Sequence, residues 1–278
     1  MKIKSKILNF FAHFGIGVTL LVLVYLVAYI TIKGAVHLTP SLFAFDYNSE
    51  NVSMLPSLVT TIMMVIFSLA LTIPLGVGTA IYLVEYAKGD NKFVKMIRLA
   101  TETLAGIPSI IYGLFGMVFF VTYLKMNMSF LAGMLTVSIM ILPTIIRSSE
   151  EALLAVAKDL REGSLGLGAG KLRTSFKIVL PMASSGIFSG IILAVGRIVG
   201  ESAALIYTAG TVAQIPGTAK NGSIFSDSAS TLAVHMNLLS SEGLHIDEAY
   251  ATAFVLLIIV ILINTFSVFL SKKLAKGK

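Results

Sequence analysis

Residues 147–181 read RSSEEALLAVAKDLREGSLGLGAGKLRTSFKIVLP, a polar stretch that lies between two long apolar runs. Each of these runs reaches about 20 residues, the length that a helix needs to cross the hydrocarbon of a bilayer. A loop as long as this one between two membrane helices usually has a structure or a function of its own. The stretch therefore predicts a membrane protein with a folded segment on one side of the bilayer.

The composition of the whole chain is that of a polytopic membrane protein. Its 278 residues are 56% hydrophobic and only 13% charged, and the mean hydropathy is +0.90. A soluble domain of this size carries about 25% charged residues. The chain has no cysteine, and its four histidines are not spaced as metal ligands. Disulfides, thiol nucleophiles and thiolate metal sites are excluded, and we expect no cofactor.

Six apolar segments are long enough to cross the membrane as helices. They lie at residues 14–32, 57–83, 104–123, 129–146, 178–207 and 249–270. The first follows three lysines, as a signal peptide would, but its apolar run is longer than that of a signal and no small-residue cleavage site follows, so we expect a retained helix. The predicted fold is all-α with six transmembrane helices. The predicted divisions are a tail, first helix and outer loop at 1–56, a helical core at 57–271 and a basic tail at 272–278.

The lysines and arginines predict the orientation of these helices. One side of the membrane receives 17 of them and the other side receives three, while Arg197 lies inside the fifth span. The positive-inside rule then places both termini in the cytoplasm of a multi-pass protein of the cell membrane. The net charge of +7 is dispersed over short loops, so we expect no nucleic-acid partner. The outer segments 36–56 and 209–248 either contact an external partner or simply connect helices.

The polar stretch has the pattern of a short amphipathic helix. Ser148 or Ser149 can cap its start, and the two glutamates that follow suit the first turn. Apolar residues then recur at helical spacing until glycines end the pattern at 166, 168 and 170. The glycines do not form a phosphate loop, because Leu165 stands where the first glycine is required and Leu172 follows Lys171. A knob for a partner's groove and a basic loop lying on anionic lipid are the two interpretations.

The spacing of the stretch resembles the EAA loop of ABC-importer permeases, which seats in a groove on the ATPase. The matching positions are Glu162-Gly163-Ser164, then Gly168, then Leu180-Pro181. Residues 72–86, 104–116, 150–169 and 196–203 resemble phosphate ABC-importer permeases, more the PstA-like than the PstC-like subunit, and the resemblance covers residues 57–270. Gly163-Ser164 departs from the two alanines of the family. Both residues are small, although glycine weakens a helix by about 1 kcal/mol relative to alanine.

The resemblance implies a type I, MetI-like permease fold and a non-catalytic subunit of an ATP-driven importer of inorganic phosphate in a bacterium or archaeon. It implies, as partners, a second homologous permease (PstC-like), two ATPase subunits (PstB-like), an external phosphate-binding protein (PstS-like), phosphate and membrane lipid. The coupling loop is expected at 147–178. The implied ATPase-coupling residues are Arg161, Glu162, Gly163, Ser164, Gly168, Leu180 and Pro181. Alternatives are a permease for molybdate, tungstate or sulfate, an ion-coupled secondary transporter, and a structural scaffold.

Two charged residues lie inside the fifth predicted span. Arg197 and Glu201 are four residues apart, so they are expected on one helix face, and each charge costs about 2.5–3.5 kcal/mol at the membrane centre. They therefore face protein or a watery path. Arg197 either offers a guanidinium fork to an anion, held by Glu201 when no anion is present, or the two neutralise each other or pair with a neighbouring subunit. Ser109 and Tyr112, after the expected kink at Pro108, are further candidates for the pathway.

The fifth span also carries two rows of small residues that let helices approach closely. The first row is Gly186, Gly190 and Ala194, and the second is Gly196, Gly200 and Ala204. Packing within the chain and a seam with a second subunit are both consistent with such rows.

Overall fold

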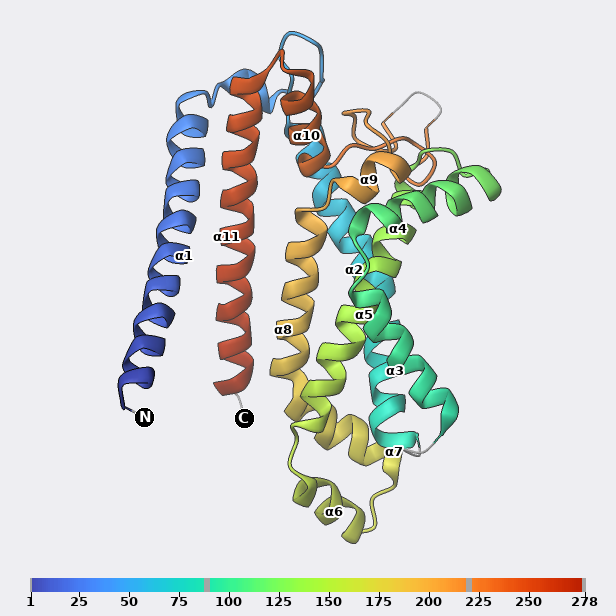
Figure 1. The fold of residues 1–278 in the computed structure, drawn as a ribbon. Coiled ribbons are helices and arrows are strands. Elements are labelled where there is room, and N and C mark those ends of the chain that lie inside the picture. The colour runs from blue at the N-terminus through green and yellow to red at the C-terminus, as the bar shows by residue number, and fades with distance from the viewer. Residues whose placement is uncertain (1, 88–90, 219–221, 277–278) are drawn as a thin grey trace.

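The computed structural model describes residues 2–87, 91–218 and 222–276, and this part of the chain is helical without a strand (Figure 1). The long helices are α1 (Lys2–Val36), α2 (Leu55–Ile81), α5 (Phe130–Leu154), α8 (Leu180–Val199) and α11 (Ile246–Lys276). The shorter helices are α3 (Lys92–Ala105), α4 (Ser109–Gly116), α6 (Lys158–Gly166), α7 (Lys171–Thr174), α9 (Ala203–Thr208) and α10 (Leu232–Glu242). One 3-10 turn, η1 (Pro40–Phe43), and three π-helical turns, η2 (Tyr82–Tyr86), η3 (Met117–Tyr123) and η4 (Ser175–Val179), complete the order. We call the two ends of the bundle the α6 end and the α10 end; α1 begins and α11 ends at the α6 end (Figure 1).

The expected membrane spans are present, one of them in a different form. Five helices of the described chain are long and apolar enough to cross a membrane, and a sixth crossing exists if the bent pair α3 and α4–η3 counts as one span. The prediction of one helix over 104–123 is wrong, because the chain bends by 104° between Ala105 and Ser109. Pro108, with ψ of 140°, lies in the bend; it has no N–H to continue the helix. The kink expected at Pro108 is confirmed.

Two further boundaries differ from the sequence prediction. Helix α5 continues past the apolar run to Leu154, so no helix begins at Ser148 or Ser149, and the Ser148 hydroxyl donates to the Thr144 carbonyl one turn earlier, at 2.8 Å. The separate segment at the α6 end therefore starts later than residue 147. The fifth span ends at Val199, and α9 is a distinct helix rather than its continuation.

Helices α2, α5 and α8 pack tightly around a shared core. A Cβ on Gly76 of α2 would lie 2.7 Å from Ile145 of α5, and a Cβ on Gly186 of α8 would lie 2.6 Å from Ala152 of α5. Both distances are shorter than carbon–carbon contact, so only glycine permits these approaches. The first small-residue row therefore packs within the chain, whereas a Cβ on Gly196 of the second row would meet no atom within 4 Å.

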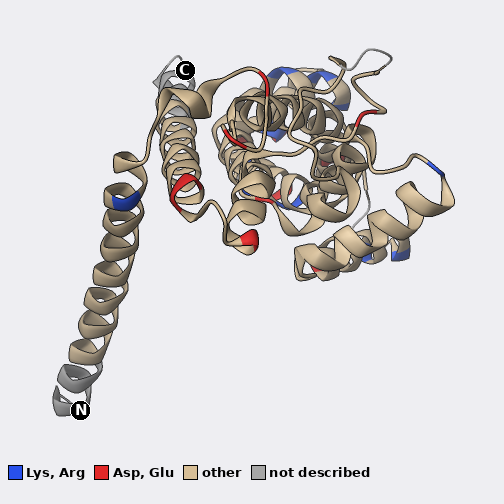
Figure 2. Ribbon diagram, turned by 90° about the horizontal axis from the view of Figure 1, so that it is seen from above, with Lys and Arg blue, Asp and Glu red and all other residues tan. Residues whose placement is uncertain are grey.

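Helices α1 and α11 lie to one side of the other helices (Figures 1 and 2). They meet near the α10 end, where a Cβ on Gly34 would overlap Phe254 and the Tyr250 carbonyl, and where the hydroxyls of Tyr29 and Tyr250 are 3.3 Å apart. None of the most apolar window of α1 is buried within the chain. The apolar surface of α1 is thus left for lipid or for another subunit.

Candidate functional site

The segment between α5 and α8 forms a knob, which we define as residues 155–176, and Arg161 ties it to the bundle. The Arg161 Nε donates to Glu85 Oε1 at 2.9 Å, and its two terminal nitrogens donate to the carbonyls of Val156 and Leu153, each at 2.6 Å. The side chains of Arg161 and Glu85 are only 17% and 13% exposed. One planar guanidinium therefore joins the end of η2, the end of α5 and helix α6, a task that suits its fork of donors.

A second tie lies inside the knob itself. The hydroxyls of Ser164 and Thr174 are 2.8 Å apart and buried, joining α6 to α7. Between these helices the chain turns at Gly168, whose φ of +83° favours glycine. The expected small pair thus has two roles: Ser164 packs inward, whereas Gly163 is exposed and a Cβ there would meet no atom within 4 Å.

The outer surface of the knob combines a free carboxylate with apolar side chains. Glu162 is exposed, and its carboxylate has no hydrogen bond or ion pair to any residue of the described chain. The exposed large apolar residues of the knob are Leu160, Leu165, Leu167, Leu172 and Phe176, with Leu167 91% exposed. Leu180 packs inward next to Val179, while Pro181 is exposed in the first turn of α8. The knob projects beyond the other helices (Figure 1) and presents an apolar surface of the kind that marks a protein contact.

The α8–α9 break separates the two charges expected on one helix face. Glu201 is buried, and its Oε1 accepts a hydrogen bond from the Ala204 N–H at 2.9 Å, which caps the start of α9. Arg197, in the last turn of α8, is half-buried. Within the described ranges it forms neither an ion pair with Glu201 nor a hydrogen bond to another residue. The structure therefore does not pair these two residues with each other.

The bend before α4 lies close to this break. The Tyr112 hydroxyl donates to the Leu104 carbonyl at 2.7 Å and so bridges the bend, with Tyr112 5% exposed. Helix α4 packs directly on α9, because a Cβ on Gly113 would lie 2.7 Å from Ala204 Cα. Ser109 is half-buried in the first turn of α4. Two broken helices thus pack against each other, and Arg197 lies in the last turn of the helix that precedes one of the breaks. Broken membrane helices of this kind are found where they line a binding site.

The sequence analysis did not single out Glu85, although it holds Arg161. A signal was present, since Glu85 is the first charged residue after Glu50 and ends a run of more than thirty uncharged residues. A carboxylate at such a position has few ways to be compensated other than a partner from another segment. The ion pair of Arg98 with Glu150, at 2.7 Å, which joins α3 to α5, was likewise not anticipated.

The apolar helices of the bundle and the polar knob between two of them are the features of a multi-pass membrane protein. The chain matches the family described as "binding-protein-dependent transport system inner membrane component" over residues 72–278, and it belongs to that family. The all-helical architecture is accordingly that of a MetI-like ABC permease.

Individual relatives and solved structures agree with this assignment. The chain is 38% identical over 195 residues to the probable ABC transporter permease protein YqgI of Bacillus subtilis, covering 67% of this chain and 65% of that protein. It is 29% identical over 277 residues to the phosphate transport system permease protein PstA of Mycobacterium leprae, covering 95% and 88%. In fold it is similar to a chain of a bacterial alginate ABC transporter in complex with a pentasaccharide-bound periplasmic protein (TM-score 0.64, 14% identity, 94% and 95% covered). A chain of the MetNI methionine ABC transporter gives a TM-score of 0.60 at 16% identity, with 89% and 97% covered.

Proposed function

We propose that this chain is a PstA-like permease subunit of an ATP-driven importer of inorganic phosphate. Relatives named as phosphate permeases support the substrate. The observation that carries the coupling mechanism is the anchored knob. Arg161 fixes it to the bundle, while Glu162 and the apolar tip point away from the bundle and are exposed. ATP hydrolysis takes place in two separate ATPase subunits, and a second homologous permease completes the translocation pathway.

In this proposal the α6 end faces the cytoplasm and the α10 end faces outward, with both termini inside. The lysine and arginine distribution supports this orientation. The chain has no cysteine, so single cysteines can report the side directly. Leu167→Cys, at a position 91% exposed, should react with a membrane-impermeant maleimide only from inside. Leu244→Cys, at a position 81% exposed, should react only from outside; the opposite pattern would reverse the orientation.

The knob transmits closure of the ATPases to the membrane helices. A movement of the knob reaches η2 and α5 through Arg161, and it is converted into inward or outward access of the pathway. The test is phosphate uptake into proteoliposomes that contain the complete transporter, supplied with ATP and the external binding protein. Glu162→Lys should abolish uptake, while the matched reversal Glu151→Lys, at an exposed position on α5 outside the knob, should retain most of it. Equal loss in both variants would remove the special role of Glu162.

Arg197 is the proposed anion-binding residue of the pathway. Its guanidinium is half-buried without a bonded partner in the described chain, and a planar fork of donors matches two oxygens of phosphate. Arg197→Lys preserves the charge but not the fork, so it should reduce uptake, and Arg197→Ala should abolish it. Full uptake by Arg197→Lys in an intact assembly would refute bidentate recognition. Competition by molybdate, tungstate or sulfate in the same assay tests the alternative oxyanions.

A further inference from the structure

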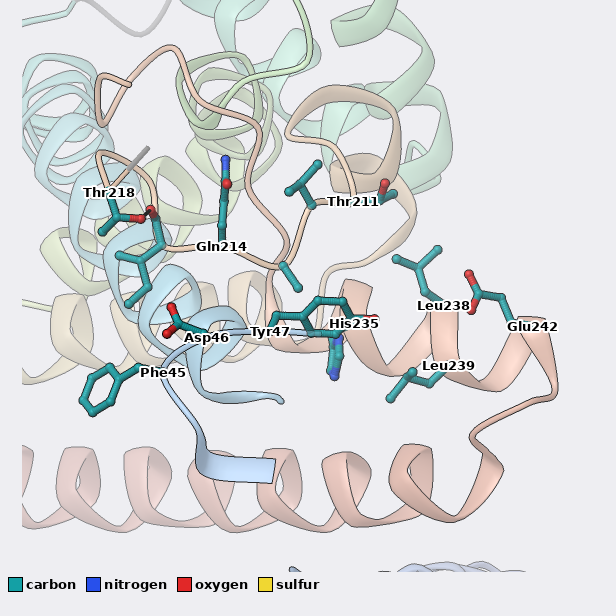
Figure 3. A pocket seen from close by; sticks show the side chains of 13 residues that line it. Phe45, Asp46, Tyr47, Thr211, Gln214, Thr218, His235, Leu238, Leu239 and Glu242 are labelled. Carbon is teal, nitrogen blue, oxygen red and sulfur yellow. Dashed lines mark hydrogen bonds between the residues drawn. The ribbon is translucent and has the colours of Figure 1, made fainter. Parts of the chain in front are cut away.

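The α10 end holds a pocket that neither the knob nor the helix breaks account for (Figure 3). Its volume is about 630 Å³, and it lies between residues 45–47, residues 211–218 and helix α10. Three segments far apart in the sequence thus build one concave site. The size is that of a site for a small molecule or for a long side chain of a partner.

The charged groups of this pocket are all acidic. Asp46 and Glu242 line it from opposite sides (Figure 3), both are exposed, and neither carboxylate is paired within the described chain. The thirteen described lining residues include no lysine or arginine. Two carboxylates across a concave surface concentrate a negative potential that attracts cations and repels anions such as phosphate. The pocket is therefore not a phosphate site.

His235 forms part of the pocket wall. It is 3% exposed and lines the pocket beside Tyr47, whose ring packs edge-on against it at 6.0 Å. One ring nitrogen bonds the backbone of Val52, whereas Nε2 is buried without a hydrogen-bond partner. Burial lowers the pKa of His235 to about 4, so the ring is neutral near pH 7. With its other nitrogen bonded to the backbone, Nε2 is an unpaired acceptor buried in the pocket wall.

The rim of the pocket is apolar and aromatic. Phe45 is 75% exposed, Val212 49% and Tyr47 42%. Exposed aromatic side chains around a pocket are typical of the centres of protein–protein interfaces, where an anchor residue is inserted and the surrounding contacts exclude water. A free small cation gains little from such a rim, whereas the stem of a long basic side chain packs well against it.

We propose that this pocket receives a lysine or arginine side chain of an external protein partner. The charge complementarity extends beyond the pocket, because the outer segments 33–56, 124–128 and 209–248 carry six acidic against three basic residues. The proposal rests on the proposed function, which supplies the outward orientation and the external phosphate-binding protein as the partner. Asp46 and Glu242 supply the negative potential that attracts the cationic head, and Phe45 and Tyr47 cover its stem.

The test measures binding of that phosphate-binding protein, loaded with phosphate, to the complete transporter in lipid nanodiscs. Asp46→Asn and Glu242→Gln remove the charges and keep the shapes. The double variant should weaken affinity by about tenfold or more at low salt, since charges at an interface govern association and register. Glu50→Gln is the matched control, because Glu50 is an exposed acidic residue of the same outer segment that does not line the pocket; it should change affinity less than about twofold, as an exposed charge contributes little.

A small probe separates the protein partner from a free cation. Ethylguanidinium at millimolar concentration should compete weakly with the binding protein in the wild type and not at all in the double variant. Unchanged affinity in the double variant, or an equal loss in Glu50→Gln, overturns the pocket proposal. So does a wild type that does not bind the phosphate-binding protein. Phosphate uptake by the wild type, measured on the same preparation, reports independently on the proposed function, which stands if uptake persists while the pocket variants bind normally.

Discussion

Replacing Arg161 by alanine should release α6 from the bundle. The variant removes the 2.9 Å ion pair with Glu85, the 2.6 Å hydrogen bond to Leu153 at the end of α5 and the 2.6 Å hydrogen bond to Val156 just after it. Because these side chains are 17% and 13% exposed, the Glu85 carboxylate is left largely buried without a partner, a loss that costs about 3–5 kcal/mol. The hydrogen-bond losses overlap with this figure, so we take about 3 kcal/mol as the lower value. The open population of α6 then rises by about a hundredfold.

The chain offers a matched control in Arg147. It forms an ion pair with Glu151 at 3.1 Å, one helical turn away, but the two side chains are 61% and 67% exposed. An exposed pair of this kind contributes about 0.3–0.5 kcal/mol. Arg147→Ala removes the same side chain and the same charge from the same end of the protein. It should therefore change the opening of α6 by less than about threefold.

Hydrogen exchange of the complete transporter in nanodiscs distinguishes the two variants. Peptides covering residues 158–174 should exchange about a hundred times faster in Arg161→Ala than in the wild type, while peptides from α2 and α5 keep their protection. The exchange rate in Arg161→Lys should lie between those of the wild type and Arg161→Ala, because one ammonium cannot reach three acceptors in different directions. If the amides of α6 exchange at the same rate in Arg161→Ala and Arg147→Ala, the anchoring role assigned to Arg161 is wrong.

Three other results are expected. Gly186→Val should lower the thermal stability of the purified chain, because a larger side chain there would collide with α5. Gly196→Val, at an open position, should leave that stability unchanged. If the second row of small residues is a subunit seam, Gly196→Val should also reduce co-purification with a second permease. Tyr112→Phe removes one hydrogen bond across the bend before α4 and should lower the free energy of unfolding by about 1 kcal/mol. A loss of uptake larger than the loss of folded protein would instead indicate a role in the pathway. Burial lowers the pKa of His235 from 6.5 in the unfolded chain to about 4 in the fold. Between these two pH values the unfolded state binds more protons, so the protection of α10 amides from exchange should fall as the pH drops from 6.5 to 4. His235→Phe should remove this pH dependence, and His245→Phe should not.

The parts of the fold set by local composition could be predicted from the sequence. Long apolar runs identified the membrane helices, because unpaired backbone groups are too costly in hydrocarbon. The glycines after Leu165 marked the end of α6, as the positive φ of Gly168 confirms. The bend before Ser109 was detectable only as a kink at Pro108, since hydropathy averages over residues 104–123 and does not register a change of direction.

The positions of the charged side chains depended on contacts that one sequence does not display. Arg161 was expected among the ATPase-coupling residues, and its partner Glu85, which lies 76 positions earlier in the chain, was not foreseen. Arg197 and Glu201 have helical spacing, but α8 ends at Val199, between them, so the spacing rule no longer applies. The carboxylate instead caps α9, whose position is set by its packing on α4.

The anchored knob and the α8–α9 break belong to one mechanical unit. The close approaches of Gly76 to Ile145 and of Gly186 to Ala152 place α2 and α8 in direct contact with α5, and close-packed helices move together rather than deform. A displacement of the knob therefore reaches the far end of α8 as a tilt. There the helix stops at Gly200, which has no side chain, and Glu201 holds α9 as a separate body. We infer that the tilt is absorbed at Gly200, so that Arg197 moves with the knob while α9 stays with α4, and the proposed anion site opens or closes between them.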